Sequence, residues 1–70
     1  MKITVNGSDM MIDRQCITVE ELYLECGLDL SAASSIIVSH NESVIKSDLW
    51  SKSQVRSGDS VEFLRLMAGG

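Results

Sequence analysis

The chain has 70 residues, of which 44% are apolar and 23% charged, with one residue each of Trp, Tyr and Phe. This length predicts a single domain whose core leaves little apolar surface for a deep substrate pocket. The formal charge of −4 argues against a nucleic-acid-binding domain and favours a partner with a basic surface. The scarcity of aromatic side chains also argues against binding single-stranded nucleic acid by stacking.

The sequence carries no recognisable export or membrane signal. Residues 1–7 lack the long apolar stretch and small-residue cleavage site of a secretory signal, and no run approaches the roughly 18 apolar residues of a membrane span. Cys16 and Cys26 are too few for a disulfide framework. We therefore expect a cytoplasmic protein with reduced thiols.

The first elements in chain order form a predicted β-hairpin. Residues 2–6 alternate between apolar and polar side chains, which is typical of a half-buried strand. Asn6-Gly7 favours a tight turn because both residues tolerate positive φ. We expect the second strand over residues 10–16, although the adjacent Met10 and Met11 leave its register undefined.

A helix is predicted over residues 19–26. Thr18 and Glu21 form a capping box, and Gly27 supplies a C-terminal cap. One helical face is apolar and consists of Val19, Leu22, Tyr23 and Cys26. The carboxylates Glu20, Glu21 and Glu25 are interpreted as capping and solvated residues, with contact to a basic partner as the alternative.

The second half of the chain predicts short elements joined by turns. The expected order is a loop over 29–35, a buried strand over 36–39, a turn at 40–43, a return strand at 44–45, a helical turn at 48–50 anchored by Trp50, a turn at 57–59 and a last strand over 60–67. Alternation along the last strand places Val61 and Phe63 on one face and Leu64 and Leu66 on the other.

This element order predicts an α+β fold. One helix can cover only one face of a sheet, so we expect a mixed sheet of four to five strands wrapped around the helix, the β-grasp arrangement. The first and last strands should be central and parallel, and the other face of the sheet should remain open.

No catalytic, metal or cofactor site is predicted within the chain. His40 is the one histidine, is expected in a turn, and has no sequence context that places it beside a nucleophile. One His and two separated Cys make a poor zinc set, a plant-type iron–sulfur centre requires four cysteines, and no phosphate-binding glycine loop is present. Cys16 and Cys26 are interpreted as packing residues. Met10, Met11 and Met67 are interpreted as core or edge packing, with a flexible recognition groove as the alternative.

The last two residues, Gly69 and Gly70, serve no turn. They are either a frayed end or a flexible segment without side chains, narrow enough to enter a partner enzyme and present the Gly70 carboxylate to it. A carboxylate is a poor acyl donor and needs activation, which a partner with a nucleotide site must supply. Leu64 and Leu66 lie beside this tail and form either a docking surface or a patch covered by residues 46–56, with Trp50 or Val55 folded over it.

Several motifs recur in the order found in one known family: Asn6-Gly7, residues 18–22 (Thr-Val-x-x-Leu), Asn41, Val44-Ile45, Trp50, Gly58-Asp59 and Gly69-Gly70. With these motifs the chain resembles, nearly end to end, the ThiS family of sulfur carrier proteins in thiamin biosynthesis, which are ubiquitin-like β-grasp proteins. Lys46 and Ser47 stand where the family often has Pro-Arg. The loop over 29–35 also departs from the family's pattern.

The resemblance implies a carrier that is a co-substrate and not an enzyme. A ThiF-like, E1-like adenylyltransferase would use ATP and Mg²⁺ to adenylate Gly70. A cysteine-desulfurase-type sulfur donor would then convert the adenylate to a thiocarboxylate, for delivery to a ThiG-like thiazole synthase. Leu64, Leu66 and Met67 are the expected docking residues.

Three alternatives remain open from the sequence. The departures at Lys46 and Ser47 leave room for a carrier that serves molybdopterin or cysteine and homocysteine synthesis. A ubiquitin-like protein modifier would use the same tail to form an amide bond with a target lysine. A plain binding domain would have an incidental Gly-Gly end.

Overall fold

The computed structural model describes residues 1–66. Its strands and helices are β1 (Lys2–Val5), β2 (Ser8–Met11), β3 (Cys16–Thr18), α1 (Val19–Glu25), the 3₁₀ helix η1 (Leu30–Ser35), β4 (Ile36–His40), β5 (Ser43–Ile45), the 3₁₀ helix η2 (Ser47–Leu49), β6 (Gln54–Arg56) and β7 (Ser60–Arg65). The main sheet has five strands in the order β2-β1-β7-β4-β5, and β3 pairs with β6 in a second, two-stranded sheet.

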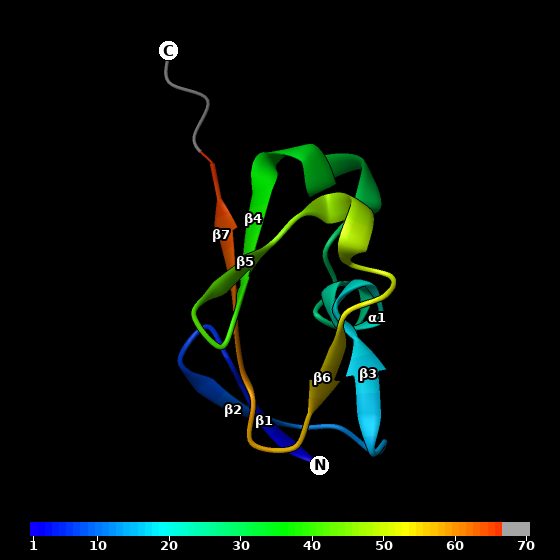
Figure 1. The fold of residues 1–70 in the computed structure, drawn as a ribbon, viewed down its shortest axis with the longest axis vertical. Coiled ribbons are helices and arrows are strands. Elements are labelled where there is room, and N and C mark those ends of the chain that lie inside the picture. Colours follow the sequence, from blue (N-terminus) through cyan, green and yellow to red (C-terminus); the bar gives the residue numbers. More distant parts are fainter. Residues whose placement is uncertain (67–70) are drawn as a thin grey trace.

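The central pair of the main sheet consists of the first and last strands, β1 and β7, which run parallel (Figure 1). The neighbouring pairs β1–β2, β4–β5 and β4–β7 are antiparallel. Helix α1 and the β3–β6 pair lie together on one side of this sheet (Figure 1). The predicted β-grasp arrangement is therefore confirmed.

The turn after β1 determines where the second strand begins. Asn6 and Gly7 both have positive φ, at 50° and 81°, and they form a two-residue hairpin loop that pairs Val5 with Ser8. The predicted strand over residues 10–16 is therefore wrong at both ends, because β2 begins directly after Gly7 and ends at Met11. The chain then turns, and Ile12 enters the core.

Helix α1 begins and ends close to the predicted residues. Both hydrogen bonds of the capping box between Thr18 and Glu21 are present. At the other end, the amide of Gly27 donates to Leu24 and that of Leu28 to Tyr23, which is a Schellman motif with Gly27 at a φ of 78°. Cys26 is the C-cap residue, so the helix ends one residue earlier than predicted. No helix in residues 1–66 has the length and apolar character that a membrane crossing needs.

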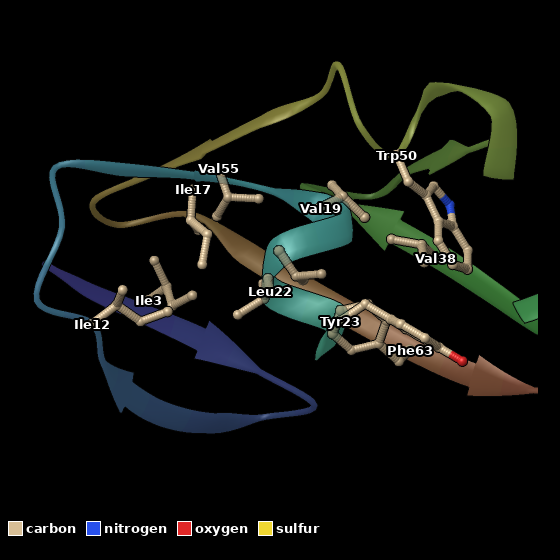
Figure 2. Packing of buried hydrophobic residues seen from close by; sticks show 11 residues of the cluster. Ile3, Ile12, Ile17, Val19, Leu22, Tyr23, Val38, Trp50, Val55 and Phe63 are labelled. Atoms are coloured by element: carbon tan, nitrogen blue, oxygen red, sulfur yellow. The ribbon is translucent and has the colours of Figure 1, made fainter. Parts of the chain in front are cut away.

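The core lies between α1 and the covered face of the main sheet (Figure 2). It consists of Ile3, Ile12, Ile17, Val19, Leu22, Tyr23, Val38, Trp50, Val55, Val61 and Phe63. The Tyr23 ring lies 5.1 Å from the Trp50 ring and 5.8 Å from the Phe63 ring, measured between centroids. The Tyr23 hydroxyl and the Trp50 indole N–H donate to backbone carbonyls, so both aromatic residues are buried with their polar atoms satisfied.

Three segments have structure that the sequence did not predict. Strand β3 covers Cys16–Thr18, between the predicted second strand and the predicted helix, and it pairs with β6 and not with β1. The expected loop over 29–35 is the 3₁₀ helix η1, which the Asp29 side chain caps by accepting a hydrogen bond from Ser31. Strand β6 was not predicted because a three-residue strand is too short for an alternating pattern to be visible. It pairs antiparallel with β3, and its central residue Val55 is fully buried.

Candidate docking surface on the open sheet face

Strand β7 presents its side chains alternately to the two faces of the main sheet. Val61 and Phe63 are 0% and 8% exposed and face the core, whereas Leu64 is 51% exposed. Leu66, directly after the strand, is 53% exposed. This confirms the predicted alternation, and it places two leucines on the face that no helix within residues 1–66 covers.

The neighbouring strands add apolar side chains to the same face. Ile37 on β4 is the register partner of Leu64, so both side chains lie on the open face. Val44 on β5 is the register partner of Ser39, on the same face, and is 69% exposed. We call Ile37, Val44, Leu64 and Leu66 the open-face patch. Sequence reasoning missed Ile37 because it lies inside an unbroken apolar run, Ile36-Ile37-Val38, in which alternation is invisible.

The hypothesis that residues 46–56 cover this patch is wrong. Trp50 is 2% exposed and Val55 0%, and both belong to the core cluster that also contains Leu22 and Tyr23 of α1. The segment therefore packs on the helix side of the sheet. Leu64 and Leu66 are left available to a partner.

Hydrogen bonds from two directions hold the end of β7 in place. The Asn6 side-chain oxygen accepts from the Phe63 amide at 2.8 Å, which ties the first hairpin turn to the last strand. The Leu66 amide donates to the Ser35 carbonyl at 2.7 Å. These two bonds therefore fix the position of the last described residues beside the open-face patch.

The opposite end of the sheet is held by His40 and Asp59. The His40 Nε2 atom lies 2.7 Å from the Asp59 carboxylate, which also accepts from the Arg56 amide at 2.9 Å. Burial acts to raise the pKa of Asp59, but the hydrogen bonds from Arg56, His40 and Asn41 outweigh it and hold this pKa below its ordinary value. His40 thus has a structural partner, but its predicted place in a turn is wrong, because it is the last residue of β4 and pairs with Ser43 and Val61.

The whole arrangement matches one known family. The sequence matches the model of the ThiS family over residues 3–70. The chain belongs to the ThiS family.

Solved structures agree with the ThiS assignment. The chain is similar to the crystal structure of the thiamine biosynthesis protein ThiS from Geobacter metallireducens, with 32% identity over the full length of both chains and a TM-score of 0.85. It is also similar to the solution structure of a thiamine biosynthesis protein from the same organism, with 31% identity, all of this chain and 88% of that chain covered, and a TM-score of 0.77. A search of curated protein sequences finds no significant match. The family and these structures together support a sulfur carrier of thiamin biosynthesis.

The motifs that carry the ThiS resemblance have identifiable structural roles. Asn6 both makes the hairpin turn and accepts from β7. Asn41 accepts from the Ser60 amide through its side chain, and its own amide donates to the Ser60 carbonyl, which joins the β4–β5 turn to the start of β7. Gly58, at a φ of 88°, makes the turn that places Asp59 beside His40. These motifs therefore position the last strand.

The remaining candidate residues have mixed outcomes. Cys26 packs partly buried against the core, and burial, followed by the nearby Glu25 carboxylate, raises the pKa of its thiol. Met10 also packs against the core. Cys16, however, is exposed, so its interpretation as a packing residue is wrong. Met11 is 75% exposed on the edge strand β2, so it lies at the sheet edge and not in the core.

Of the three carboxylates on α1, Glu21 is a capping residue and Glu25 is solvated, as predicted. Glu21 accepts from Arg14 at 2.7 Å and from the Thr18 amide at 3.0 Å, and these bonds lower its pKa to about 2. Glu25 is exposed, and Glu20 is partly buried.

The predicted docking surface and the predicted C-terminal tail both include residues beyond those described. Met67, Gly69 and Gly70 lie outside residues 1–66. Within the described part of the chain, no group of three or more His, Cys, Asp or Glu side chains could hold a metal ion.

Proposed function

We propose that this protein carries sulfur for thiazole formation in thiamin biosynthesis, as a co-substrate of partner enzymes, with the sulfur held on the Gly70 carboxylate. The observation that carries the proposal is the ThiS family match, which runs from residue 3 to residue 70 and so includes both terminal glycines. The similar Geobacter metallireducens structures, described as thiamine biosynthesis proteins, favour this pathway over molybdopterin or cysteine synthesis.

The first chemical step activates the carboxylate. A ThiF-like adenylyltransferase with ATP and Mg²⁺ would let a Gly70 carboxylate oxygen attack the α-phosphorus of ATP. The acyl-adenylate forms and pyrophosphate leaves. Mg²⁺ and the partner's own residues would stabilise the phosphate charge, since no phosphate-binding glycine loop occurs in this sequence.

The second step exchanges oxygen for sulfur. The terminal sulfur of a persulfide, supplied by a cysteine-desulfurase-type donor, would attack the acyl carbon and release AMP. A thiol reductant would then cleave the resulting acyl disulfide and leave the Gly70 thiocarboxylate. A ThiG-like thiazole synthase would accept this sulfur.

Docking would use the open face of the sheet. Leu64 and Leu66 lie at the end of β7, close in sequence to Gly70, and Ile37 and Val44 extend the same apolar area. We assign Met67 to this docking surface as well. A surface of this kind would hold the carrier while its tail enters the partner's active site.

Mass spectrometry tests the proposal. The protein is incubated with the ThiF-like enzyme of its own organism, ATP, Mg²⁺, a persulfide donor and a thiol. The expected product has a mass gain equal to the exchange of one oxygen for sulfur at Gly70, and a variant that lacks Gly70 shows none. The absence of any mass gain with an enzyme of verified activity contradicts the proposal, as does a stable conjugate with target lysines, which would indicate a protein modifier.

A further inference from the structure

The two asparagines of the chain, Asn6 and Asn41, have the same structural role. Each is the first residue of a two-residue turn, with a φ of 50° at Asn6 and 49° at Asn41. The side-chain oxygen of each accepts a hydrogen bond of 2.8 Å from a β7 amide, that of Phe63 for Asn6 and that of Ser60 for Asn41. The two turns differ in the second residue, which is glycine after Asn6 and glutamate after Asn41.

This difference matters for the chemistry of the asparagine side chain, which is among the thermolabile groups of proteins. The backbone nitrogen of the following residue can attack the carboxamide carbon. A C–N bond forms, the carboxamide nitrogen leaves as ammonia together with the proton of the attacking nitrogen, and a five-membered succinimide remains. Water then opens this ring at one of its two carbonyls and gives either aspartate or isoaspartate.

The residue after the asparagine determines how easily this attack occurs. Gly7 has no Cβ to hinder its own nitrogen, and the space that a Cβ would occupy there is open. Both Asn6 and Gly7 are exposed, so water reaches the reacting atoms. Glu42 instead carries a side chain next to the nitrogen that would attack Asn41. The sequence around Asn6 therefore favours the reaction, and that around Asn41 disfavours it.

The fold restrains the reaction at Asn6. Its backbone amide donates to the Val61 carbonyl at 3.0 Å, and its side-chain oxygen holds the Phe63 amide. Attack requires the carboxamide carbon and the Gly7 nitrogen to come into close, aligned contact. The hydrogen bond from Phe63 restricts the side-chain rotation that this contact needs. The turn leads into the edge strand β2, however, and short edge segments open more readily than a central strand.

We propose that Asn6 is a site of spontaneous deamidation to isoaspartate and aspartate, reached when the β1–β2 turn opens, and that Asn41 is not. The inference goes beyond the proposed function and does not depend on it. Isoaspartate carries one additional methylene in the backbone, within a turn whose two residues determine the pairing of Val5 with Ser8. Its formation therefore disturbs this turn and weakens the tie between Asn6 and Phe63 in β7.

Peptide mass spectrometry of the full-length protein tests the proposal after prolonged incubation near neutral pH. Trypsin separates the two asparagines, since cleavage after lysine and arginine gives the peptides 3–14 and 15–46. The exchange of an amide for a carboxyl group is measured in each peptide, relative to the value before incubation. Methylation by a protein isoaspartyl methyltransferase with S-adenosylmethionine identifies isoaspartate. We expect deamidation at Asn6 to be at least about tenfold faster than at Asn41, and about tenfold faster again in urea, which removes the restraint of the fold.

Glu42→Gly supplies the matched variant, because it places glycine after Asn41 as well. Glycine adopts the φ of 72° at this position without strain, so the variant should fold. In urea, deamidation at Asn41 should rise to the rate at Asn6. Equal rates at the two asparagines of the wild type, a native protein without isoaspartate at Asn6, the same rate at Asn6 in urea as in native buffer, or a stable Asn41 in unfolded Glu42→Gly each overturns the inference. None of these outcomes affects the proposed sulfur transfer.

Discussion

Phe63 and Leu64 are consecutive residues of one strand with opposite surroundings. Phe63 is 8% exposed and lies against Tyr23 in the core, whereas Leu64 is 51% exposed on the face that no helix covers. The comparison extends to the whole sheet. The single Trp, Tyr and Phe of the chain are all in the core, and the open face has only aliphatic and polar residues in its central strands.

The difference between the faces indicates how a 70-residue chain divides its apolar residues. Burial of large side chains on one face stabilises the domain, and a small domain has few such residues to spare. The open face can then hold Leu64 and Leu66 for a partner at little cost to folding. This division predicts that substitutions on the two faces will affect different measurements.

The largest effect on stability is expected for Phe63→Ala. Removing a buried aromatic ring leaves a cavity beside Tyr23, and the free energy of unfolding should fall by about 3–5 kcal/mol. Because a domain of this size is rarely much more stable than that, the variant is expected to be largely unfolded. Urea unfolding followed by Trp50 fluorescence measures the change, since Trp50 is the one tryptophan and lies in the same cluster.

Phe63→Leu makes the same comparison measurable in a folded protein. The variant retains an apolar side chain, so its free energy of unfolding should fall by only about 1–2 kcal/mol. An unfolding free energy for this variant that equals the wild-type value would contradict the assignment of Phe63 to the core.

A smaller loss of stability is expected at Asn6, whose side chain joins the β1–β2 turn to β7. In Asn6→Ala the Phe63 amide loses its acceptor and the residue must still adopt a φ of 50°, so stability should fall by about 2–3 kcal/mol. Asn6→Gly also loses the acceptor, but glycine adopts positive φ freely, so a loss of stability of about 1 kcal/mol is expected. Equal losses in the two variants would show that the turn conformation contributes nothing. Thermal and urea unfolding measure both.

The fold was predictable where local signals are strong. The capping box at Thr18 and the Asn6-Gly7 turn each specify one conformation through short-range hydrogen bonds or positive φ, and both were predicted correctly. The 3₁₀ helix η1 was missed because its residues show no apolar periodicity. Strand β6 was missed because it is too short for alternation to be visible and forms by pairing with a distant segment, as in the pairing of Val55 with Ile17. Tertiary contacts of this kind override weak local preference.

The candidate site was predictable in part for the same reason. Leu64 and Leu66 follow from alternation along a single strand. Ile37 and Val44 join them only through the register of neighbouring strands, which the sequence does not show. The roles proposed for Gly69 and Gly70 remain a proposal: the family match includes both residues, and they lie outside the described part of the chain.

A further loss of stability, which depends on pH, is expected for Asp59→Asn. The hydrogen bonds that Asp59 accepts from His40 and Arg56 favour its carboxylate, and the variant should be less stable by about 1–2 kcal/mol at neutral pH. Since the folded-state pKa lies below the ordinary 3.8, this contribution is complete above the unfolded-state pKa and is lost as the pH falls through the folded-state pKa.

Urea unfolding of wild type and Asp59→Asn from pH 7 down to pH 2 measures this difference. The gap between the two proteins should be constant near neutral pH and should close below about pH 4. Other carboxyls with lowered pKa values, such as Glu21, affect both proteins equally and cancel in the comparison. A gap that widens towards acid would contradict the assigned direction.

The smallest effect on stability is expected for Leu64→Ala, and it is the most direct comparison of the two faces. Leu64 is already half exposed, so its truncation should change the free energy of unfolding by no more than about 0.5 kcal/mol. Docking of the adenylating enzyme should nevertheless weaken, with a rise of about tenfold in the KM for the carrier. The matched control is Leu24→Ala, which truncates a leucine that is 48% exposed on α1, away from the sheet's open face. If the two variants have the same KM, exposure alone does not identify a docking residue, and the open face has no special role in recognition.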